Sequence, residues 1–547
     1  MNRREWTLPA VLCVVLAIVH TWPLATSPGV LSRNDNGDAQ LNEWILAWVP
    51  HALASSPGQI FQGNIFYPAN DTLAFSEPLI VPALLGAPIG LLGGSPVLVF
   101  NLLVLAGFAL TAFAAYTLMF AWTGDRAAAL LTGSTFAFNT HTLTRLAHVQ
   151  GLHLYGIPLA LLAVDRLLET ARVRDALWLA LWMTVMAYTS GYLLVFGTIM
   201  TAVVLLVRIR EWLPRAATVL SRFALAALVA ACAIVPLAIP YQRAATEQRM
   251  VRSLREVAEF SATPKGYLAA AGRLHFGTWS AVFFKDPVDS FFPGFIVIGL
   301  SIVVLMRSIN RRAPLEALTR RRVAMLLAVA AAGAVLSLGL RTPVYGWLYS
   351  VFPPMRGLRA AARFGNLFLF GMSALAGLGL AVLRARWRSN PTHSRLVLAF
   401  TVVLIAIANV EALRAPFLYR RFTGIPRLYT LLRSEPNVVL AEVPFYPRQA
   451  VFENAEYVLN STAHWRPLMN GYSGYTPATY HAVAEVFWYF PREYAIDAMR
   501  KAGVTHVMVH PTRFGSEGPA VLETLAARRD FELMGVAPGG LHLYRLH

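Results

Sequence analysis

The 547-residue chain is poor in charge and in cysteine. Charged residues make up 14% of it, well below the roughly 25% of an average soluble domain. Hydrophobic residues reach 56%, and the mean hydropathy is +0.52. This composition excludes an ordinary soluble protein and indicates a polytopic membrane protein. The two cysteines, Cys13 and Cys232, both lie inside apolar segments, so no disulfide framework is implied.

Common catalytic signatures are also missing. There is no Gly-x-x-x-x-Gly-Lys-Ser/Thr and no strand-linked Gly-x-Gly-x-x-Gly, so neither ATP nor a nucleotide sugar is indicated as a direct ligand. There is no Gly-x-Ser-x-Gly and no His-Glu-x-x-His, which weakens a hydrolase interpretation. The sequence shows no internal repeat, and inverted repeats are the usual sign of a transporter.

The cations, by contrast, are abundant. The formal charge is +18, from 47 Lys and Arg against 29 Asp and Glu, and nearly all of the cations are Arg. They cluster in short connectors, which is the positive-inside pattern of cytoplasmic loops and argues against nucleic-acid binding. The clusters are Arg172 and Arg174; Arg208, Arg210, Arg215 and Arg222; Arg307, Arg311, Arg312, Arg320, Arg321 and Arg322; and Arg384, Arg386, Arg388 and Arg395.

Apolar segments near the required length of ~20 residues predict about eleven spans. They are 6–23, 97–121, 126–140, 151–168, 176–190, 191–207, 223–240, 291–306, 323–340, 364–383 and 396–413. The first is interpreted as an uncleaved helix with a cytoplasmic N-terminus. The stretch 79–93 contains Pro82 and Pro88 and is predicted to be a re-entrant or interfacial segment, since irregular backbone at membrane depth must line a protein cavity.

The predicted fold class is therefore an α-helical polytopic membrane protein with a small extracytoplasmic α/β domain. Residues 1–413 form the membrane domain, with 24–96 as the first outer loop and 241–290 as the second large one. Residues 414–547 form the α/β domain, with strands near 438–440, 504–509 and 541–544 and helices near 479–490 and 518–529. The first outer loop carries a helix with Trp44 and Trp48 on one face.

Asp38 is the principal candidate for a catalytic acid or base. It follows Asn34 to Gly37 and begins the helix of the first outer loop, so a helix N-cap is the alternative interpretation. Asp35 and Glu43 are neighbouring acids, and Glu77 lies at the mouth of the re-entrant segment. Glu77 is a second acid, a metal ligand together with Asp38, or a solvated loop residue.

Two further stretches suggest an anion site on the outer side. The connector 139–153 holds several polar residues, with His148 and Gln150 expected to point the same way; its three histidines match no metal-ligand spacing, and a solvated connector is the alternative. Residues 353–364 place Arg356, Arg359 and Arg363 where the positive-inside rule expects none. Arg359 and Arg363 are four residues apart, predicted on one helical face, and guanidinium groups suit phosphate. Lipid headgroups are the alternative ligand.

The chain resembles the GT-C superfamily of polytopic membrane glycosyltransferases, which take sugars from polyprenyl-phosphate carriers. The resemblance rests on Gly37-Asp38 leading into 41–48, on Phe66-Tyr67-Pro68 and Phe75-Ser76-Glu77, on His148-Val149-Gln150, and on 359–364, 461–467 and 470–475. It implies a bacterial inner-membrane enzyme with its C-terminal domain extracytoplasmic. Many members carry another acid in the next large outer loop, whereas 139–150 contains no Asp or Glu.

The resemblance also implies roles. Asp38 would accept a proton from an acceptor hydroxyl, and Arg359, Arg363, His148 and Gln150 would bind the donor phosphate. The partners would be a polyprenyl-phosphate-linked sugar, membrane lipids and a glycan, lipid or protein acceptor; a divalent cation at Asp38 and Glu77 stays open. Acceptor or sugar contacts are expected from the C-terminal domain, at His464, Arg466, Asn470, Tyr472 and Tyr475; a structural loop is the alternative interpretation.

Two competing functions remain. A transporter or flippase of a lipid-linked glycan or another anion would need intramembrane charges through several spans, and the sequence offers few, namely Asp165, Glu169 and Glu411. A catalytically inactive, glycan-binding scaffold is the third interpretation.

Overall fold

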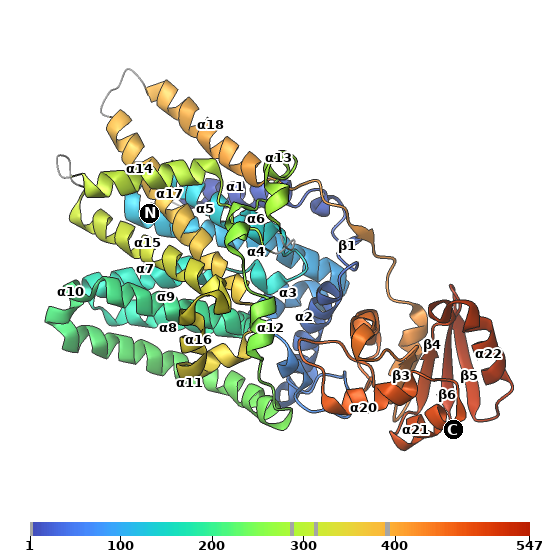
Figure 1. Cartoon of the computed structure of the whole chain (residues 1–547). Helices are drawn as coiled ribbons and strands as arrows, with labels where there is room; N and C mark the ends of the chain where they lie inside the picture. The colour runs from blue at the N-terminus through green and yellow to red at the C-terminus, as the bar shows by residue number, and fades with distance from the viewer. Residues whose placement is uncertain (1–3, 285–288, 311–314, 389–393) are drawn as a thin grey trace. The chain divides into compact units, whose positions relative to one another are not determined.

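The computed structural model describes residues 4–284, 289–310, 315–388 and 394–547 (Figure 1). Arg311 and Arg312 of the basic clusters lie outside the described residues. The structure confirms the helical membrane class, because each of the eleven predicted spanning segments corresponds to a helix. These are α1 (Arg4–His20), α4 (Pro96–Thr123), α5 (Arg126–Ala137), α7 (Gly156–Thr170), α8 (Val173–Thr189), α9 (Gly191–Val207), α11 (Ala216–Glu247), α14 (Phe295–Ile309), α15 (Ala317–Ser337), α17 (Gly365–Arg388) and α18 (Ser394–Ala412).

Not all of these helices are equally long or apolar. Within the described ranges, five helical stretches are long and apolar enough to cross a membrane by length and composition. Shorter apolar helices include Gly191–Val207 and Phe295–Ile309. The stretch predicted to be re-entrant forms α3 (Ile80–Leu91), which at 12 residues is too short for a full span.

The chain divides into two compact units. The first, here the helical unit, comprises Met1–Ser27, Leu102–Val235 and Val251–Leu418. The second, here the mixed unit, comprises Pro28–Asn101, Pro236–Met250 and Tyr419–His547. The first outer loop thus groups with the C-terminal region. The division into 1–413 and 414–547 stays a prediction about domains, and each unit is described by itself below.

In the helical unit, α17 lies beside α5, α14 and α15 (Figure 1). Glycines permit this close approach, as small residues do between membrane helices. A Cβ at Gly379 would collide with the carbonyl oxygen of Leu300 in α14, and one at Gly377 would collide with the hydroxyl of Thr132 in α5. A bulkier residue at either position would therefore force two helices apart.

Several charges of the helical unit are neutralised within the fold. Buried Asp165 of α7 accepts from Arg208, and its other oxygen accepts from Nε of Arg322 at 3.0 Å. Glu411 of α18 accepts from the backbone N–H groups of Phe295 at 2.8 Å and Ile296 at 3.2 Å, at the start of α14. The few acids that the sequence placed in spans therefore have structural partners.

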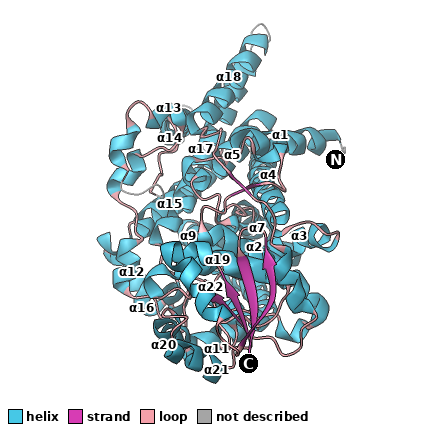
Figure 2. Ribbon diagram, turned by 90° about the vertical axis from the view of Figure 1, so that its right-hand side faces the viewer, coloured by secondary structure: helices cyan, strands magenta, loops and turns pink. Residues whose placement is uncertain are grey.

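The mixed unit contains a four-stranded sheet, drawn in magenta in Figure 2. Its strand order is β3-β4-β6-β5. Strands β3 (Leu440–Val443) and β4 (His506–Val509) are parallel, and the other pairs are antiparallel. The helices around it are α19 (Ala455–Asn460), α20 (Ala478–Phe487), α21 (Glu493–Lys501) and α22 (Gly518–Ala526). The predicted α/β character is confirmed, with α20 and α22 at the predicted helices.

Two strands differ from or extend the prediction. Strand β6 (Leu541–Leu546) occupies the predicted closing strand, whereas β5 (Phe531–Ala537) was not predicted. Strand β5 is at the edge of the sheet, has a register shift between Leu533 and Gly535, and exposes Leu533 and Val536. The bulge and the exposed apolar residues hide the alternation by which a strand is recognised in sequence.

Two segments of the mixed unit that are far apart in sequence run together. The N–H of Phe66 donates to the carbonyl of Asn470 at 3.1 Å, and the N–H of Tyr67 donates to that of Leu468 at 3.0 Å. Nearby, Gly471 lies so close to the ring of Phe66 that a Cβ would collide with it. The residues around 64–67 and 468–471 that carried part of the family resemblance thus form one packed junction.

Candidate functional site

Asp38 lies in the first turn of α2 (Gly37–Ser55). The N-cap of this helix is Asn36, whose side-chain oxygen accepts from the N–H of Asp38 at 2.9 Å. The alternative interpretation, in which Asp38 itself caps the helix, is therefore wrong, because the cap lies two residues earlier, at Asn36. The Asp38 carboxylate accepts a hydrogen bond from the hydroxyl of Tyr472 at 2.7 Å and is partly exposed.

Gly37 explains how Asp38 and Tyr472 can meet. A Cβ at Gly37 would lie 3.2 Å from the Cβ of Ala455 and 3.3 Å from the ring of Tyr472. Both distances are shorter than ordinary van der Waals contact, so a larger residue would push the start of α2 away from α19 and Tyr472. Gly37 thus lets the start of α2 pack closely against Tyr472, and Asp38 supplies the carboxylate that Tyr472 bonds.

The other candidate acids have different surroundings. Asp35 is exposed and pairs with Arg33 at 3.2 Å, and Glu77 is partly exposed in the loop before α3. Among the residues that the structure describes, no group of three His, Cys, Asp or Glu side chains is arranged to hold a metal ion. Asp38 and Glu77 thus do not belong to a described metal-ligand set of that size.

Glu43 of α2 is completely buried. With the Asn34 amide oriented to satisfy the hydrogen-bond network, its nitrogen donates to both carboxyl oxygens of Glu43, at 3.1 and 2.8 Å. Burial raises the pKa of Glu43 well above its ordinary value of 4.5, and the Asn34 hydrogen bond opposes this rise. Glu43 therefore ties the loop before α2 to the helix interior.

A stability measurement can test the state of Glu43. Because its pKa is higher in the folded chain than in the unfolded chain, the folded state holds the proton longer, and the free energy of unfolding falls as pH rises above 4.5. The slope is at most about 1.4 kcal/mol per pH unit. We expect Glu43→Gln, which cannot ionise, to show a weaker loss of thermal stability than wild type as pH rises above 4.5. Parallel melting curves for the two proteins would contradict this.

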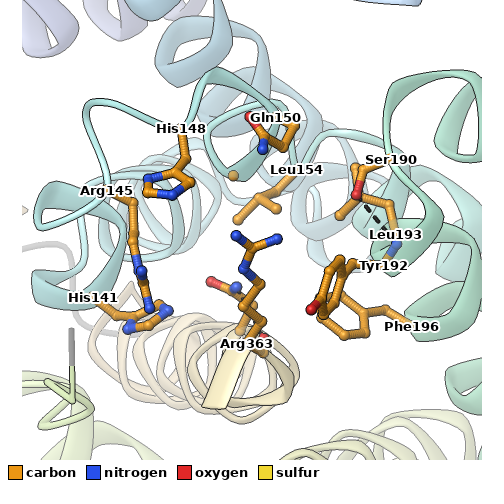
Figure 3. Close-up of a pocket in the computed structure, with 12 residues that line it drawn as sticks. His141, Arg145, His148, Gln150, Leu154, Ser190, Tyr192, Leu193, Phe196 and Arg363 are labelled. Atoms are coloured by element: carbon orange, nitrogen blue, oxygen red, sulfur yellow. Dashed lines mark hydrogen bonds between the residues drawn. The ribbon is translucent and has the colours of Figure 1, made fainter. Parts of the chain in front are cut away.

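The helical unit contains a pocket. Its polar lining carries four basic side chains and no carboxylate, so it is suited to an anion. Figure 3 shows the guanidinium of Arg363 extending into the middle of the ring of side chains, toward His148 and Gln150. The lining residues are His141, Arg145, His148, Gln150, Gly151, Leu154, Ser190, Tyr192, Leu193, Phe196, Arg363 and Asn366.

Tyr192 holds Arg363 and the backbone before α17 in place. The guanidinium lies over the ring of Tyr192, with 4.4 Å between its central carbon and the ring centroid. The hydroxyl of Tyr192 in turn accepts from the backbone N–H groups of Arg359 at 3.0 Å and Ala360 at 2.8 Å. Tyr192 thus supports both the side chain and the backbone of this stretch.

Arg359 is positioned differently from Arg363. It lies between the short 3-10 helices Pro353–Gly357 and Ala361–Phe364, so the expectation of one shared helical face is wrong. The two Arg-containing turns are interrupted by extended backbone, which breaks the spacing of an α-helix. The guanidinium of Arg359 lies over Phe260 at 5.2 Å and 3.9 Å from Glu256, and Arg359 is not part of the pocket lining.

Of the five residues expected to contact an acceptor, three are engaged inside the mixed unit. Buried Asn470 bonds the backbone of Glu442 in both directions, at 2.8 and 2.9 Å. Arg466 donates to two backbone carbonyls, those of Leu432 and Arg433. His464 is buried, and burial together with the charges of Arg466 and Arg433 lowers its pKa to about 3.

The two tyrosines of that set are partly exposed. Tyr472 donates to Asp38, as described above, and Tyr475 donates to the backbone carbonyl of Gln248 at 2.7 Å. Within the mixed unit, Tyr472 is therefore the predicted acceptor residue that meets the predicted base.

The sequence analysis missed part of the pocket. Ser190, Tyr192 and Asn366 were not considered, although Ser190-Gly191-Tyr192 interrupts two apolar segments and Asn366 follows Arg363 by one turn. Such a polar break between two apolar helices was the available signal. His141 and Arg145 belonged to the polar connector that was noted, without an assigned role.

No family model and no curated protein matches the chain. Among solved structures, the arabinofuranosyltransferase AftD from Mycobacteria is 16% identical with a TM-score of 0.61, and the match covers 100% of this chain and 40% of AftD. A mutant of AftD is 16% identical with a TM-score of 0.60, and the match covers 100% of this chain and 42% of the mutant. The archaeal oligosaccharyltransferase AglB from Archaeoglobus fulgidus, solved with an inhibitory peptide and a dolichol-phosphate, is 12% identical with a TM-score of 0.45 over 100% of this chain and 74% of AglB.

The chain thus spans about two-fifths of the length of AftD. At 16% identity, the similarity to AftD shows a shared fold and nothing more. The helical unit, the short α3 and the small sheet all agree with the architecture expected from the sequence. The chain has a fold similar to that of AftD.

Proposed function

We propose that the protein is a membrane glycosyltransferase that moves a sugar from a polyprenyl-phosphate carrier to an acceptor hydroxyl on the extracytoplasmic side, with Asp38 as the general base. The observation that carries the proposal is the Asp38 carboxylate, partly exposed at the start of α2 and oriented by Tyr472 at 2.7 Å. AftD, which has a similar fold, is named an arabinofuranosyltransferase.

The two units supply different chemistry to this reaction. In the mixed unit, Asp38 accepts the proton of the acceptor hydroxyl as that oxygen attacks the anomeric carbon. In the helical unit, Arg363, His148 and Gln150 bind the donor phosphate and stabilise the negative charge that it gains when the bond to the sugar breaks. Arg145 of the same lining adds a second guanidinium.

The absence of acids in the lining supports a phosphate ligand. A carboxylate would repel the anion and neutralise the guanidinium groups, and none lines the pocket among the residues that the structure describes. The guanidinium of Arg363 lies over the ring of Tyr192, which holds it at the pocket. We propose a bacterial cytoplasmic membrane as the location, with the acceptor a glycan, a lipid or a protein.

A turnover assay separates this function from a transporter or flippase. The full chain is reconstituted in nanodiscs and given polyprenyl-phospho-pentose or polyprenyl-phospho-hexose with radiolabelled sugar, without any pathway for transport. We expect release of polyprenyl phosphate together with sugar transfer to added glycan, or slow transfer to water. Lipid translocation in vesicles with no cleavage of any donor tested would overturn the proposal and favour a flippase.

The buried acids already favour turnover over transport. Asp165 is bound by Arg208 and Arg322, and Glu411 caps the backbone of α14. Side chains with such partners stabilise the bundle and are poorly suited to release and rebind a passing ion.

A further inference from the structure

An aromatic stack lies toward the C-terminal end of α2, in the mixed unit. Trp44 and Trp48 are stacked, with ring centroids 5.8 Å apart. The outer pair is His51 and Trp465, whose rings are nearly parallel, 11° apart, with centroids at 4.3 Å. The ring of Trp48 contacts both members of this outer pair at 5.7 Å. The four rings therefore form one continuous cluster that extends from the core to a partly exposed end.

The inner and outer rings differ in their hydrogen bonds. Trp44 and Trp48 are buried, and their indole N–H groups donate to Asn64 at 3.0 Å and to the carbonyl of Ile60 at 2.8 Å. His51 and Trp465 are partly exposed. Among the described residues, neither the indole N–H of Trp465 nor a ring nitrogen of His51 has a hydrogen-bond partner in the structure. The outer pair thus offers aromatic surface with unused polar groups at its edge.

The backbone of Trp465 is strained. Its φ is +60°, in the left-handed region that a tryptophan rarely adopts, which costs roughly 1–3 kcal/mol. Neighbouring bonds hold this conformation: the N–H of Trp465 donates to Ser461 at 2.8 Å, and Arg466 is fixed to two carbonyls by its guanidinium and to Asn64 by its own carbonyl. Strain that the surroundings enforce so fully points to a requirement for this ring in this orientation.

We infer that His51 and Trp465 form a sugar-binding platform for a part of the acceptor that is remote from the reacting hydroxyl. A ring face carries partial negative charge, and the C–H face of a sugar carries the complementary partial positive charge. The imidazole and indole nitrogens can then bond the hydroxyls at the sugar's edge. This inference rests on the proposed function and names the acceptor as an oligosaccharide.

The helix sets the distance between this platform and the proposed base. Asp38 and His51 belong to the same helix, α2, and a rise of 1.5 Å per residue separates them by about 20 Å along its axis. A single sugar is too small to reach from one to the other. A chain of several sugars can bind at the platform while its terminal hydroxyl approaches Asp38.

A lipid surface is the competing ligand, because Trp side chains also favour the membrane interface. Interfacial anchoring tolerates many ring orientations, whereas here a strained backbone and a parallel stack fix one orientation. The observations therefore favour carbohydrate.

Trp465→Gly is the sharpest test, because glycine adopts a positive φ freely and removes the ring without adding strain. The full chain in nanodiscs, carrying Asp38→Asn and no donor, is titrated with a disaccharide and an octasaccharide from arabinan, mannan and glucan series. We expect the Trp465→Gly change to weaken octasaccharide binding about tenfold and to leave disaccharide binding unchanged. Trp488→Gly, which removes another exposed tryptophan of the mixed unit, is the control and should change neither.

The same variants are then compared in transfer assays with Asp38 present. The KM for octasaccharide should rise about tenfold in Trp465→Gly, while kcat with the disaccharide stays as in wild type. Equal affinity of the wild type for both lengths in every series would overturn the inference, as would quenching of Trp465 fluorescence by brominated lipids. Because binding is measured without turnover, it can succeed even if Asp38 proves not to be the base, so the two proposals fail separately.

Discussion

Asp38→Asn is expected to lower kcat for sugar transfer by roughly 100- to 10,000-fold, the usual contribution of a general base. Asparagine has nearly the same shape, and its amide oxygen can still accept the hydrogen bond that Tyr472 makes to the carboxylate. The substitution therefore removes the ability to take a proton and little else. The KM for the donor lipid should change little, since the proposed phosphate site lies in the helical unit.

Asp35→Asn provides the matched control. Asp35 lies in the same loop and is an exposed acid whose ion pair with Arg33 is 3.2 Å long, and such a surface pair contributes about 0–1 kcal/mol. This variant should retain transfer near the wild-type rate. If Asp38→Asn turned over a purified polyprenyl-phospho-sugar as fast as Asp35→Asn does, Asp38 would not be the base.

Tyr472→Phe is expected to shift the pH dependence of kcat/KM. A purely structural role of Tyr472 would not produce this shift. The phenol donates to the carboxylate, and a hydrogen bond to the charged form favours that form. Without it, the acid limb of the kcat/KM profile should move to higher pH, while the rate on the plateau changes less than in Asp38→Asn. An unchanged pH profile would mean that Tyr472 only packs against Gly37.

Arg363→Ala is expected to raise the KM for the donor lipid by roughly 10- to 100-fold, because a hydrogen bond to a charged group contributes about 1.5–3 kcal/mol. The guanidinium extends into the pocket, supported by the ring of Tyr192. Arg363→Lys should recover only part of the affinity, since an ammonium lacks the planar fork that binds phosphate at two points. Binding of polyprenyl phosphate without sugar, measured in nanodiscs, checks the same interaction without turnover.

Arg359→Ala is compared with Arg363→Ala to test whether the position of the guanidinium matters or only its positive charge. Both substitutions remove one cation from the same stretch, but Arg359 lies beside Phe260 and Glu256 and does not line the pocket. Its loss should raise the donor KM by much less than the loss of Arg363. Equal effects of the two variants would indicate a diffuse attraction to lipid headgroups instead of a defined phosphate site.

The helical architecture was predictable because long apolar runs leave few alternatives in a membrane. Each backbone polar group must be satisfied within its own segment, so a run such as Pro96–Thr123 can only be a helix. The broken stretch that became α3 was also predictable from Pro82 and Pro88. Strand β5 was not, because a bulged edge strand with Leu533 and Val536 exposed lacks a clear period.

The sequence allowed the residues of the candidate site to be predicted, but not the contacts between them. Asp38, His148, Gln150 and Arg363 were identified as chemically capable groups. Their partners were not, because Tyr472 meets Asp38 across 434 positions of sequence. For Arg359 the spacing was misleading, because a helical period was assumed where the backbone alternates between 3-10 turns and extended residues.

The sequence by itself determined the class of molecule: a basic, helical membrane protein with a carboxylate at the start of a helix in its first long loop and a small α/β region in its C-terminal part. These properties follow from local composition and period, which each segment carries alone. Only the tertiary structure decided which groups lie together. It gave the cap of α2 to Asn36, joined Asp38 to Tyr472, selected Arg363 over Arg359, and stacked Trp465 on His51. Such pairings depend on how distant segments pack, and no local pattern encodes them.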